Sequence, residues 1–436
     1  MSNANFIDAL RYGDTLMAAR FRVYKNGVPY GPVQSAAMST GSITVDRTAE
    51  FRRSGSINLE VIPPQPGKPL PLYFPLSPTS LINPFGTELL IEVGIATPDA
   101  VAGNGGSIPD SQYQSLGLFR IVETQIDDQV SDCVVTLTLN DRGYTLAQRT
   151  LQTPYDFPAT PSKLFTTEIQ TFLNKVWQQD PNMAPLVYNI TPNNIKVPQA
   201  SFNQGADPFA SAQQIAQSVG YELFFDPMGV LVARPIPNPL TQPVTWNYTD
   251  SPTAIYSNTG TGSNALNQSP YSTAVEEQLT MTSQGIYNMV VIQGTGTANA
   301  TSYNGPGGTP SGTPTLAVAA DNNPNSPTYV KGGLGTIPNF DSSSLITSAG
   351  AQSLANSELQ ISLSSAWTAT LTVPAIPQLD VDDVITITRP RIGLVNAKVV
   401  VDTITHGLSY ADMTQVTGRI LTNDWVPGSL EPEGGI

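Results

Sequence analysis

Short runs in which apolar and polar residues alternate dominate the first 150 residues, and they most limit how this chain can fold. Successive side chains of a strand point to opposite faces, so a period of two predicts strands buried on one side. Asn26 and Gly27 separate two runs and favour a tight hairpin turn. We therefore predict an all-β unit over residues 1–150, with long loops at 63–85 and 98–112. Its alternating runs are Phe21–Tyr24, Ser42–Asp46, Ser56–Val61, Glu88–Gly94, Leu116–Glu123 and Val134–Leu139.

Residues 151–240 change from a period of two to a helical period. The segment 162–178 places apolar residues on one helix face, and Asp207 followed by proline is a helix start signal. Gly220 then stands where a helix ends, directly before the hairpin pattern Tyr221–Arg234. These signals predict a smaller α+β domain. The apolar face of the first helix consists of Phe165, Ile169, Phe172, Leu173 and Val176.

The rest of the chain predicts a second β unit. Residues 241–274 are expected as a linker, 275–425 as the β unit with an inserted loop at 294–345, and 426–436 as a flexible tail. The predicted fold class is mainly β with a smaller α+β part, in a multidomain chain. The predicted elements are strands at Tyr287–Ile292, Thr368–Val373, Val384–Thr388, Ala397–His406 and Thr414–Leu421, and a short helix at Ser348–Leu359.

Two residue counts exclude several kinds of chemistry. Cys133 is the only cysteine and His406 the only histidine, so an intrachain disulfide, a thiolate zinc cluster and a two-histidine metal site cannot form. Charged residues make up 12% of the chain and the formal net charge is −14, which disfavours general nucleic-acid binding. No apolar stretch approaches the ~18 residues of a membrane span.

The two conventional catalytic candidates, His406 and Cys133, lack the other residues that a catalytic site needs. His406 could act as a general base oriented by Asp402, but no serine or cysteine elbow accompanies it, so a strand-end histidine is the favoured interpretation. Cys133 begins a strand and is interpreted as a small core residue rather than a nucleophile. We predict no catalytic, cofactor-binding or metal-binding residues, and a chain that is not an enzyme.

Acidic pairs also fall short of a site. Asp127-Asp128, Glu276-Glu277 and Asp382-Asp383 are sequence neighbours, and neighbours in a strand face opposite ways, whereas a glycosidase needs two carboxylates across a sugar. The segment Asp380–Val384 could offer oxygens to calcium, but it lacks the pattern of a calcium loop. An acidic turn leading into a strand is the favoured interpretation.

The remaining motifs have plain structural interpretations. Gly294-Thr295-Gly296 lacks the third glycine and the helix of a dinucleotide loop. Arg52-Arg53 and the segment 389–391 are the densest basic spots, and each is interpreted as a solvated or interface pair. Trp177 is interpreted as core, whereas carbohydrate stacking stays open for the other tryptophans. Those are Trp246, Trp367 and Trp425.

An ordered series of segments resembles the phage tail hub proteins, the baseplate or tail-tip family with β-barrel domains like those of the tail tube. The resemblance runs over residues 10–420. Its segments are Ser115–Ile121, Val134–Leu137, Asn140–Tyr144, Asp207–Phe209, Gly220–Asp226, Val232–Pro235, Tyr287–Val291, Ser326–Val330 and Asp382–Pro390.

The resemblance implies a structural virion protein, assembled in the host bacterial cytoplasm and located at the tail tip or baseplate. It implies a homotrimer with two tube-like β-barrels per chain, mapped to 1–150 and 275–425, and a lateral domain at 151–240. The implied partners are the tail tube or distal tail ring protein, a tip or spike protein and the tape measure protein. Genomic DNA would pass through the trimer without specific binding.

Charge adds two expectations to this resemblance. A trimer would carry 3 × (−14) = −42, and an acidic lumen would repel phosphate and let DNA slide. The first 60 residues carry seven Lys or Arg against five acids and could face an acidic partner ring. Two alternatives stay open: a virion-associated carbohydrate-active enzyme, and a receptor-binding tail protein.

Overall fold

The computed structural model describes most of the chain, and strands make up most of its regular structure. The described residues are 16–25, 27–31, 38–60, 80–128, 133–157, 163–178, 184–196, 200–249, 271–272, 276–294, 315–324, 326, 328–333, 335–343, 348–389, 392, 394–409 and 412–421. The mainly β fold class predicted from the sequence is confirmed.

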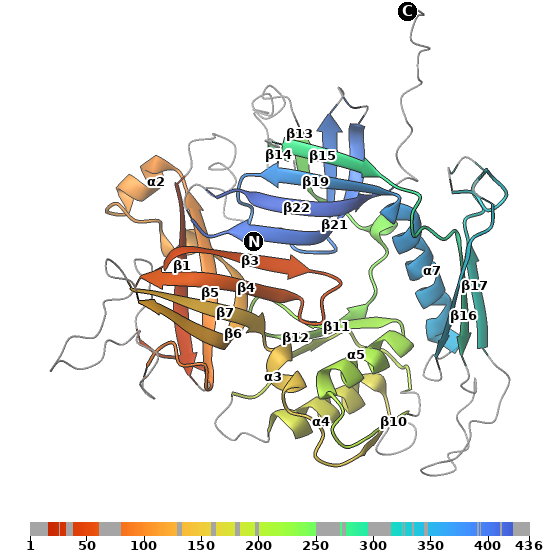
Figure 1. The fold of residues 1–436 in the computed structure, drawn as a ribbon, viewed down its shortest axis with the longest axis horizontal. Coiled ribbons are helices and arrows are strands. Elements are labelled where there is room, and N and C mark those ends of the chain that lie inside the picture. The colour runs from red at the N-terminus through yellow and green to blue at the C-terminus, as the bar shows by residue number, and fades with distance from the viewer. Residues whose placement is uncertain are drawn as a thin grey trace, which may run out of the picture.

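A 14-stranded sheet forms the body of the molecule (Figure 1). Its first half is antiparallel, in the order β3-β4-β7-β6-β5-β1-β2. The pairing of β1 with β2, with Lys25 opposite Val28, confirms the predicted hairpin. Alternate residues of β7, including Val135, Leu137 and Leu139, are buried, as the period of two predicted. The strands are β1 (Leu16–Lys25), β2 (Val28–Pro29), β3 (Met38–Asp46), β4 (Arg53–Glu60), β5 (Thr87–Ala96), β6 (Tyr113–Asp128) and β7 (Cys133–Asp141).

The second half of the sheet comes from the C-terminal part of the chain. Its strands are β13 (Val244–Thr249), β14 (Tyr271–Ser272), β15 (Glu276–Met281), β19 (Trp367–Val373), β20 (Val384–Arg389), β21 (Leu394–Gly407) and β22 (Thr414–Ile420). β13 lies in the segment expected as a linker and pairs in parallel with β20. The reason is its own alternation, since Trp246 and Tyr248 both point into the core.

One long strand joins the halves. β21 pairs with β22 along one side, and on the other side it pairs first with β20 and then with β3. The contact with β3 runs from Thr403 opposite Asp46 to Gly407 opposite Ser42. A single hydrophobic core therefore extends through both halves of the sheet.

The predicted α+β domain packs below the sheet with its own core. The predicted helix over 162–178 is confirmed as α4, and its predicted apolar face is buried. Asp207 caps α5 by accepting hydrogen bonds from the amides of Phe209 and Ala210, and Gly220 follows with a φ of 77°. The elements are α3 (Gly143–Ala147), β8 (Tyr155–Phe157), α4 (Phe165–Trp177), β9 (Tyr188–Ile190), β10 (Ala200–Phe202), α5 (Pro208–Ser218), β11 (Tyr221–Phe225), β12 (Leu231–Pro235) and the turn η2 (Pro239–Thr241).

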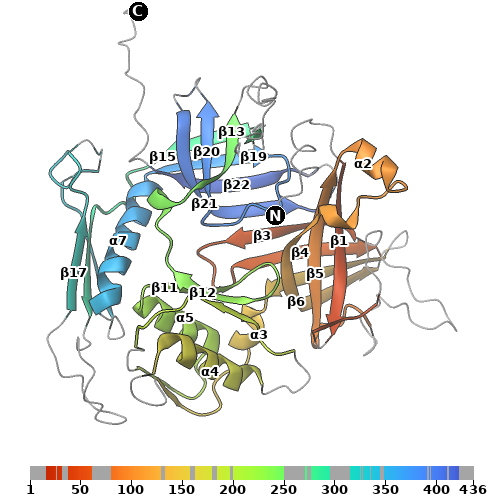
Figure 2. The same cartoon turned by 180° about the vertical axis from the view of Figure 1, so that it is seen from behind.

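A third, smaller unit consists of a three-stranded sheet and one helix (Figure 2). Its elements are β16 (Met289–Gly294), β17 (Thr315–Ala320), β18 (Pro338–Ser343) and α7 (Ser348–Ser365), and β16 lies between the other two strands. The segment expected as an inserted loop thus supplies two strands. Likewise, the loop expected at 98–112 contains α2 (Pro98–Gly103) and the turn η1 (Asp110–Gln112). None of the described helices has the length and apolar composition needed to cross a membrane.

Candidate functional site at the interdomain junction

Three segments far apart in the sequence meet beneath the sheet. They are the turn between β3 and β4, the turn that precedes β20, and the β11–β12 hairpin of the α+β domain. The second turn is fixed by its backbone, because the amide of Asp382 donates to the carbonyl of Val401 at 2.8 Å and Asp382 has a φ of 70°. Aspartate tolerates this left-handed conformation better than most residues. The turn therefore aims a buried carboxylate at the junction.

Three arginines surround that carboxylate. Nε of Arg47 lies 2.5 Å from Oδ1 of Asp382. Oδ2 of Asp382 lies 3.1 Å from Nη2 of Arg234 and 3.3 Å from Nη1 of Arg52. The side chain of Asp382 is only 5% exposed, so these charges attract one another with little screening by water. One carboxylate thus links the first half of the sheet and the α+β domain to the second half.

Other charges complete the junction. Glu222 of β11 accepts from Arg52 at 3.0 Å and from Arg234 at 2.5 Å, and the guanidinium of Arg52 stacks over the ring of Phe224. Arg53 is fully buried and pairs with Asp380. The carboxylates of this network are neutralised by fixed cations, which suits a structural lock.

A second set of contacts holds the tip of the same hairpin. Arg142 donates two hydrogen bonds of 2.9 and 2.8 Å to the carboxylate of Glu88, and a third of 3.1 Å to the carbonyl of Gly229. Asp141 accepts from the amides of Arg53 and Gly143. The segment Asn140–Tyr144, which carries part of the family resemblance, therefore anchors the α+β domain to β5 and β4.

Burial shifts the pKa of several groups around the junction. Burial raises the pKa of Asp383 and of Asp141 to about 6, against the hydrogen bonds that each accepts. Burial, together with the charge of Arg53, lowers the pKa of His406 to about 4. At neutral pH the histidine is therefore neutral and the two carboxyls are ionised.

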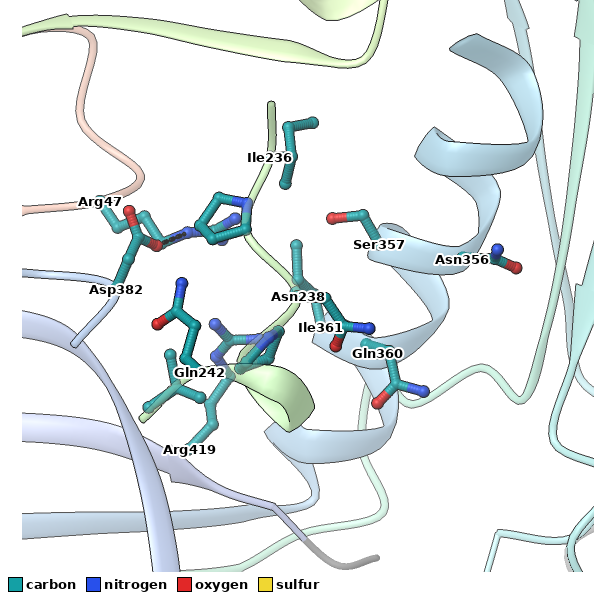
Figure 3. A pocket seen from close by; sticks show the side chains of 13 residues that line it. Arg47, Ile236, Asn238, Gln242, Asn356, Ser357, Gln360, Ile361, Asp382 and Arg419 are labelled. Atoms are coloured by element: carbon teal, nitrogen blue, oxygen red, sulfur yellow. Dashed lines mark hydrogen bonds and ion pairs between the residues drawn. The ribbon is translucent and has the colours of Figure 1, made fainter. Parts of the chain in front are cut away.

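Two pockets flank the junction on the side of α7. One of about 170 Å³ is lined by Arg47, Asp382 and Arg419 from the sheet side and by Ser357 and Gln360 from α7 (Figure 3). Another of about 390 Å³ lies between α7 and the β11–β12 hairpin. The helix therefore meets the body through loosely filled, partly polar contacts.

The catalytic candidates do not form a site. His406 is buried in β21, with its Nδ1 3.4 Å from the hydroxyl of Thr414. Asp402 instead accepts from Nε of Arg419 at 2.9 and 2.7 Å, so its carboxylate does not orient the histidine. Cys133 is buried and forms no disulfide, in agreement with its interpretation as a core residue.

The acidic pairs lie apart or are used internally. Asp127 and Asp128 are exposed at the end of β6, Glu277 pairs with Arg389 at 3.1 Å, and Asp382 belongs to the junction. In the described part of the chain, no group of three or more His, Cys, Asp or Glu side chains could hold a metal ion.

The tryptophans and the glycine motif offer no exposed platform among the described residues. Trp177 is buried and its indole donates to the carbonyl of Ala184 at 2.7 Å, while Trp246 is buried in the main core and Trp367 packs against it. Trp425 and the motif residues after Gly294 lie outside the described residues, as do Pro390 and Arg391.

The expectation that the basic residues of the first 60 positions face a partner ring is wrong for most of them. Arg20 and Arg22 pair with Glu92, and Arg47, Arg52 and Arg53 are used in the junction. Their charges are satisfied within the chain. Sequence reasoning missed Glu222 and Asp382 as the partners of Arg47 and Arg52, because no local spacing links residues separated by more than 100 positions.

No family model matches the chain, and no curated protein matches its sequence. Several solved structures match nearly its whole length, including the following two. The tail protein from Neisseria meningitidis MC58 gives a TM-score of 0.57 at 13% identity, over 94% of this chain and 98% of that one. The 43 kDa tail protein of prophage MuSo2 from Shewanella oneidensis gives a TM-score of 0.53 at 13% identity, over 93% of this chain and 100% of that one. The chain therefore has the fold of phage tail proteins, which confirms at the level of the fold the resemblance found in its sequence.

Proposed function

We propose that this chain is a structural virion protein that forms a trimeric hub at the distal end of a phage tail. The hub would connect the tail tube, or a distal tail ring, to the tip or spike, and would contact the tape measure protein. The observation that carries the proposal is the match of nearly the whole chain to two tail proteins. The proposed place of assembly is the bacterial cytoplasm.

The sheet topology supports a ring with pseudo-sixfold symmetry. Each half of the sheet contributes six strands of six or more residues. They are β1, β3, β4, β5, β6 and β7 in one half, and β13, β15, β19, β20, β21 and β22 in the other. Three chains would then place six similar sheet units around one axis. We propose these halves as the two tube-like domains, with residues 151–240 as a lateral domain and with β13 assigned to the second half.

The proposed channel would let DNA leave the tail without binding it specifically. The chain carries a net charge of −14, and the arginines of the junction are neutralised by carboxylates. A surface with excess negative charge repels phosphate, so DNA would slide past it. Electron density for DNA bound tightly to isolated rings would contradict this part of the proposal.

A hydrolytic role finds no supporting geometry among the described residues. An active site for glycans needs two carboxylates on opposite sides of a groove. The larger pocket offers Glu50, Glu222 and Glu358, and Glu222 is held by two arginines. We therefore propose a role without catalysis.

Light scattering coupled to gel filtration tests the assembly. A trimer of the 46.4 kDa chain has a mass of about 139 kDa, three times the chain mass. Electron microscopy of the purified trimer should show a ring, and gold-labelled antibodies should bind virions at the tail tip. A chain that stays monomeric at high concentration, or that cleaves peptidoglycan or capsule, would overturn the proposal.

A further inference from the structure

The small sheet of β16, β17 and β18 has one covered and one uncovered face. Val290 and Ile292 of β16 and Ala317 and Ala319 of β17 are buried in the core with α7. Because side chains alternate along a strand, the residues between them point away from the helix. The register aligns these residues in two rows across the sheet. The rows are Ala320, Met289 and Pro338, and Val318, Val291 and Phe340.

The six residues of these two rows, which we call the outer face, are all apolar, whereas the next outward position of β16 is the exposed polar residue Gln293. None of its six side chains can carry a charge. Phe340 is 73% exposed and Val318 is 43% exposed, although both lie in the middle of strands. An ordered apolar surface that stays open to water marks a contact surface more often than a single exposed residue does.

Among the described residues, the outer face lies on the side of the small sheet that is away from the body. In both views α7 lies between the small sheet and the body of the molecule (Figures 1 and 2). The outer face is on the opposite side of the sheet from α7, so it points outward from the body. The described elements of the body therefore do not cover it.

We propose that the outer face packs against a neighbouring copy of this chain in the ring. The inference rests on the proposed function, since it assumes that copies assemble side by side. Each copy carries a net charge of −14, so two copies repel except where uncharged surfaces meet. A foreign partner of basic charge would instead be drawn to the acidic parts of the surface. An uncharged face therefore suits contact between copies.

The size of the outer face also favours a neighbour in a ring. A contact that holds two proteins by itself buries about 800 Å² per partner, from some 20–30 residues on each side. Six residues supply only part of that. A neighbour in a closed ring is held by several contacts at once, so a small apolar face can add to them. We expect Phe340 to be the anchor, because buried aromatic side chains carry much of the energy of such contacts.

Two substitutions test the inference on the full chain. Phe340→Asp and Val318→Asp would each place a charge in the contact, and each should weaken the trimer at least 30-fold in dilution experiments. Val187→Asp is the matched control, since Val187 is 57% exposed and lies in the lateral domain. Melting curves and near-ultraviolet circular dichroism check that each variant folds.

The outcomes separate the inference from the proposed function. Wild-type chain that is a trimer, with loss of the trimer in the two face variants and not in the control, supports both. A trimer that survives both variants overturns the inference alone, and a monomeric wild type overturns both. If Phe340→Asp does not fold, Phe340→Cys labelled with a benzophenone maleimide decides. Cross-links to a second copy support the inference, and cross-links within one copy only overturn it.

Discussion

Replacing Asp382 by asparagine should loosen the α+β domain from the sheet. Asparagine keeps the size of the side chain and tolerates the φ of 70° at this position, so the turn should stay intact. The substitution removes the negative charge that Arg47, Arg52 and Arg234 share. Three guanidinium groups would then surround a neutral amide in a buried place.

The expected cost follows from how these arginines are paired. Removing one partner of a buried ion pair typically costs about 3–5 kcal/mol, because a charge is left without compensation. Arg52 and Arg234 keep Glu222 as a partner, whereas Asp382 is the carboxylate that Arg47 contacts. We therefore expect the lower end of the range, about 3 kcal/mol. At 1.36 kcal/mol per factor of ten, that corresponds to roughly 150-fold in an opening equilibrium.

Hydrogen exchange followed by mass spectrometry measures this opening directly. Peptides that cover β11 and β12 should exchange roughly 150-fold faster in the variant, whereas peptides from β5 and β6 should change little. Asp110→Asn is the matched control, because Asp110 also pairs with an arginine but is 84% exposed. Unchanged exchange in the hairpin, or an equal increase in every peptide, would refute the reasoning.

Two further substitutions test the sheet. The pKa of buried His406 is about 4, whereas an ordinary histidine has a pKa of 6.5. Between pH 6.5 and about pH 4 the histidine of the unfolded chain therefore binds a proton and that of the folded chain does not. The free energy of unfolding consequently falls as the pH falls through this range. At a pH of about 4.5 the loss from this histidine reaches about 2.5 kcal/mol. Asp383 and Asp141, each with a pKa of about 6, change the stability in the opposite direction over this range, and they do so in both proteins. Between about pH 7.5 and about pH 4.5, the free energy of unfolding of His406→Gln should therefore change about 2.5 kcal/mol more favourably than that of the natural chain, and an equal change in both would contradict the assigned pKa. Gly418→Ala would place a Cβ 2.3 Å from the carbonyl oxygen of Val400. Urea unfolding should therefore show that the substitution lowers the free energy of unfolding by about 1–3 kcal/mol. An unchanged free energy would show that β21 and β22 can move apart.

Local patterns account for the parts of the fold that the sequence predicted. The helix α5 was predicted because its cap, its first-turn proline and its apolar spacing lie within a few residues of one another. The strands of the first half were predicted because each carries its own alternation. These signals act between near neighbours, so one sequence is enough to read them.

The parts that escaped prediction depend on distant residues or short elements. β17 and β18 are six-residue strands within a polar, Gly-rich and Pro-rich stretch, and their pairing with β16 decides their structure. The pairing of β21 with β3 joins residues more than 350 positions apart. The junction was missed for the same reason: Arg52 was interpreted only as part of a solvated or interface pair, and its partners Glu222 and Asp382 lie far away in the sequence.

Buried charge at the junction serves orientation more than stability. Replacing a buried ion pair by apolar residues is often neutral or stabilising, so the energy of these pairs alone gives little reason to keep them. An apolar contact between the α+β domain and the sheet could slide or rotate at small cost, whereas Asp382 meets Arg47, Arg52 and Arg234 in one arrangement only. We infer that the network fixes how the domains sit relative to one another. In the proposed ring, that fixed geometry would present the same surfaces from every copy.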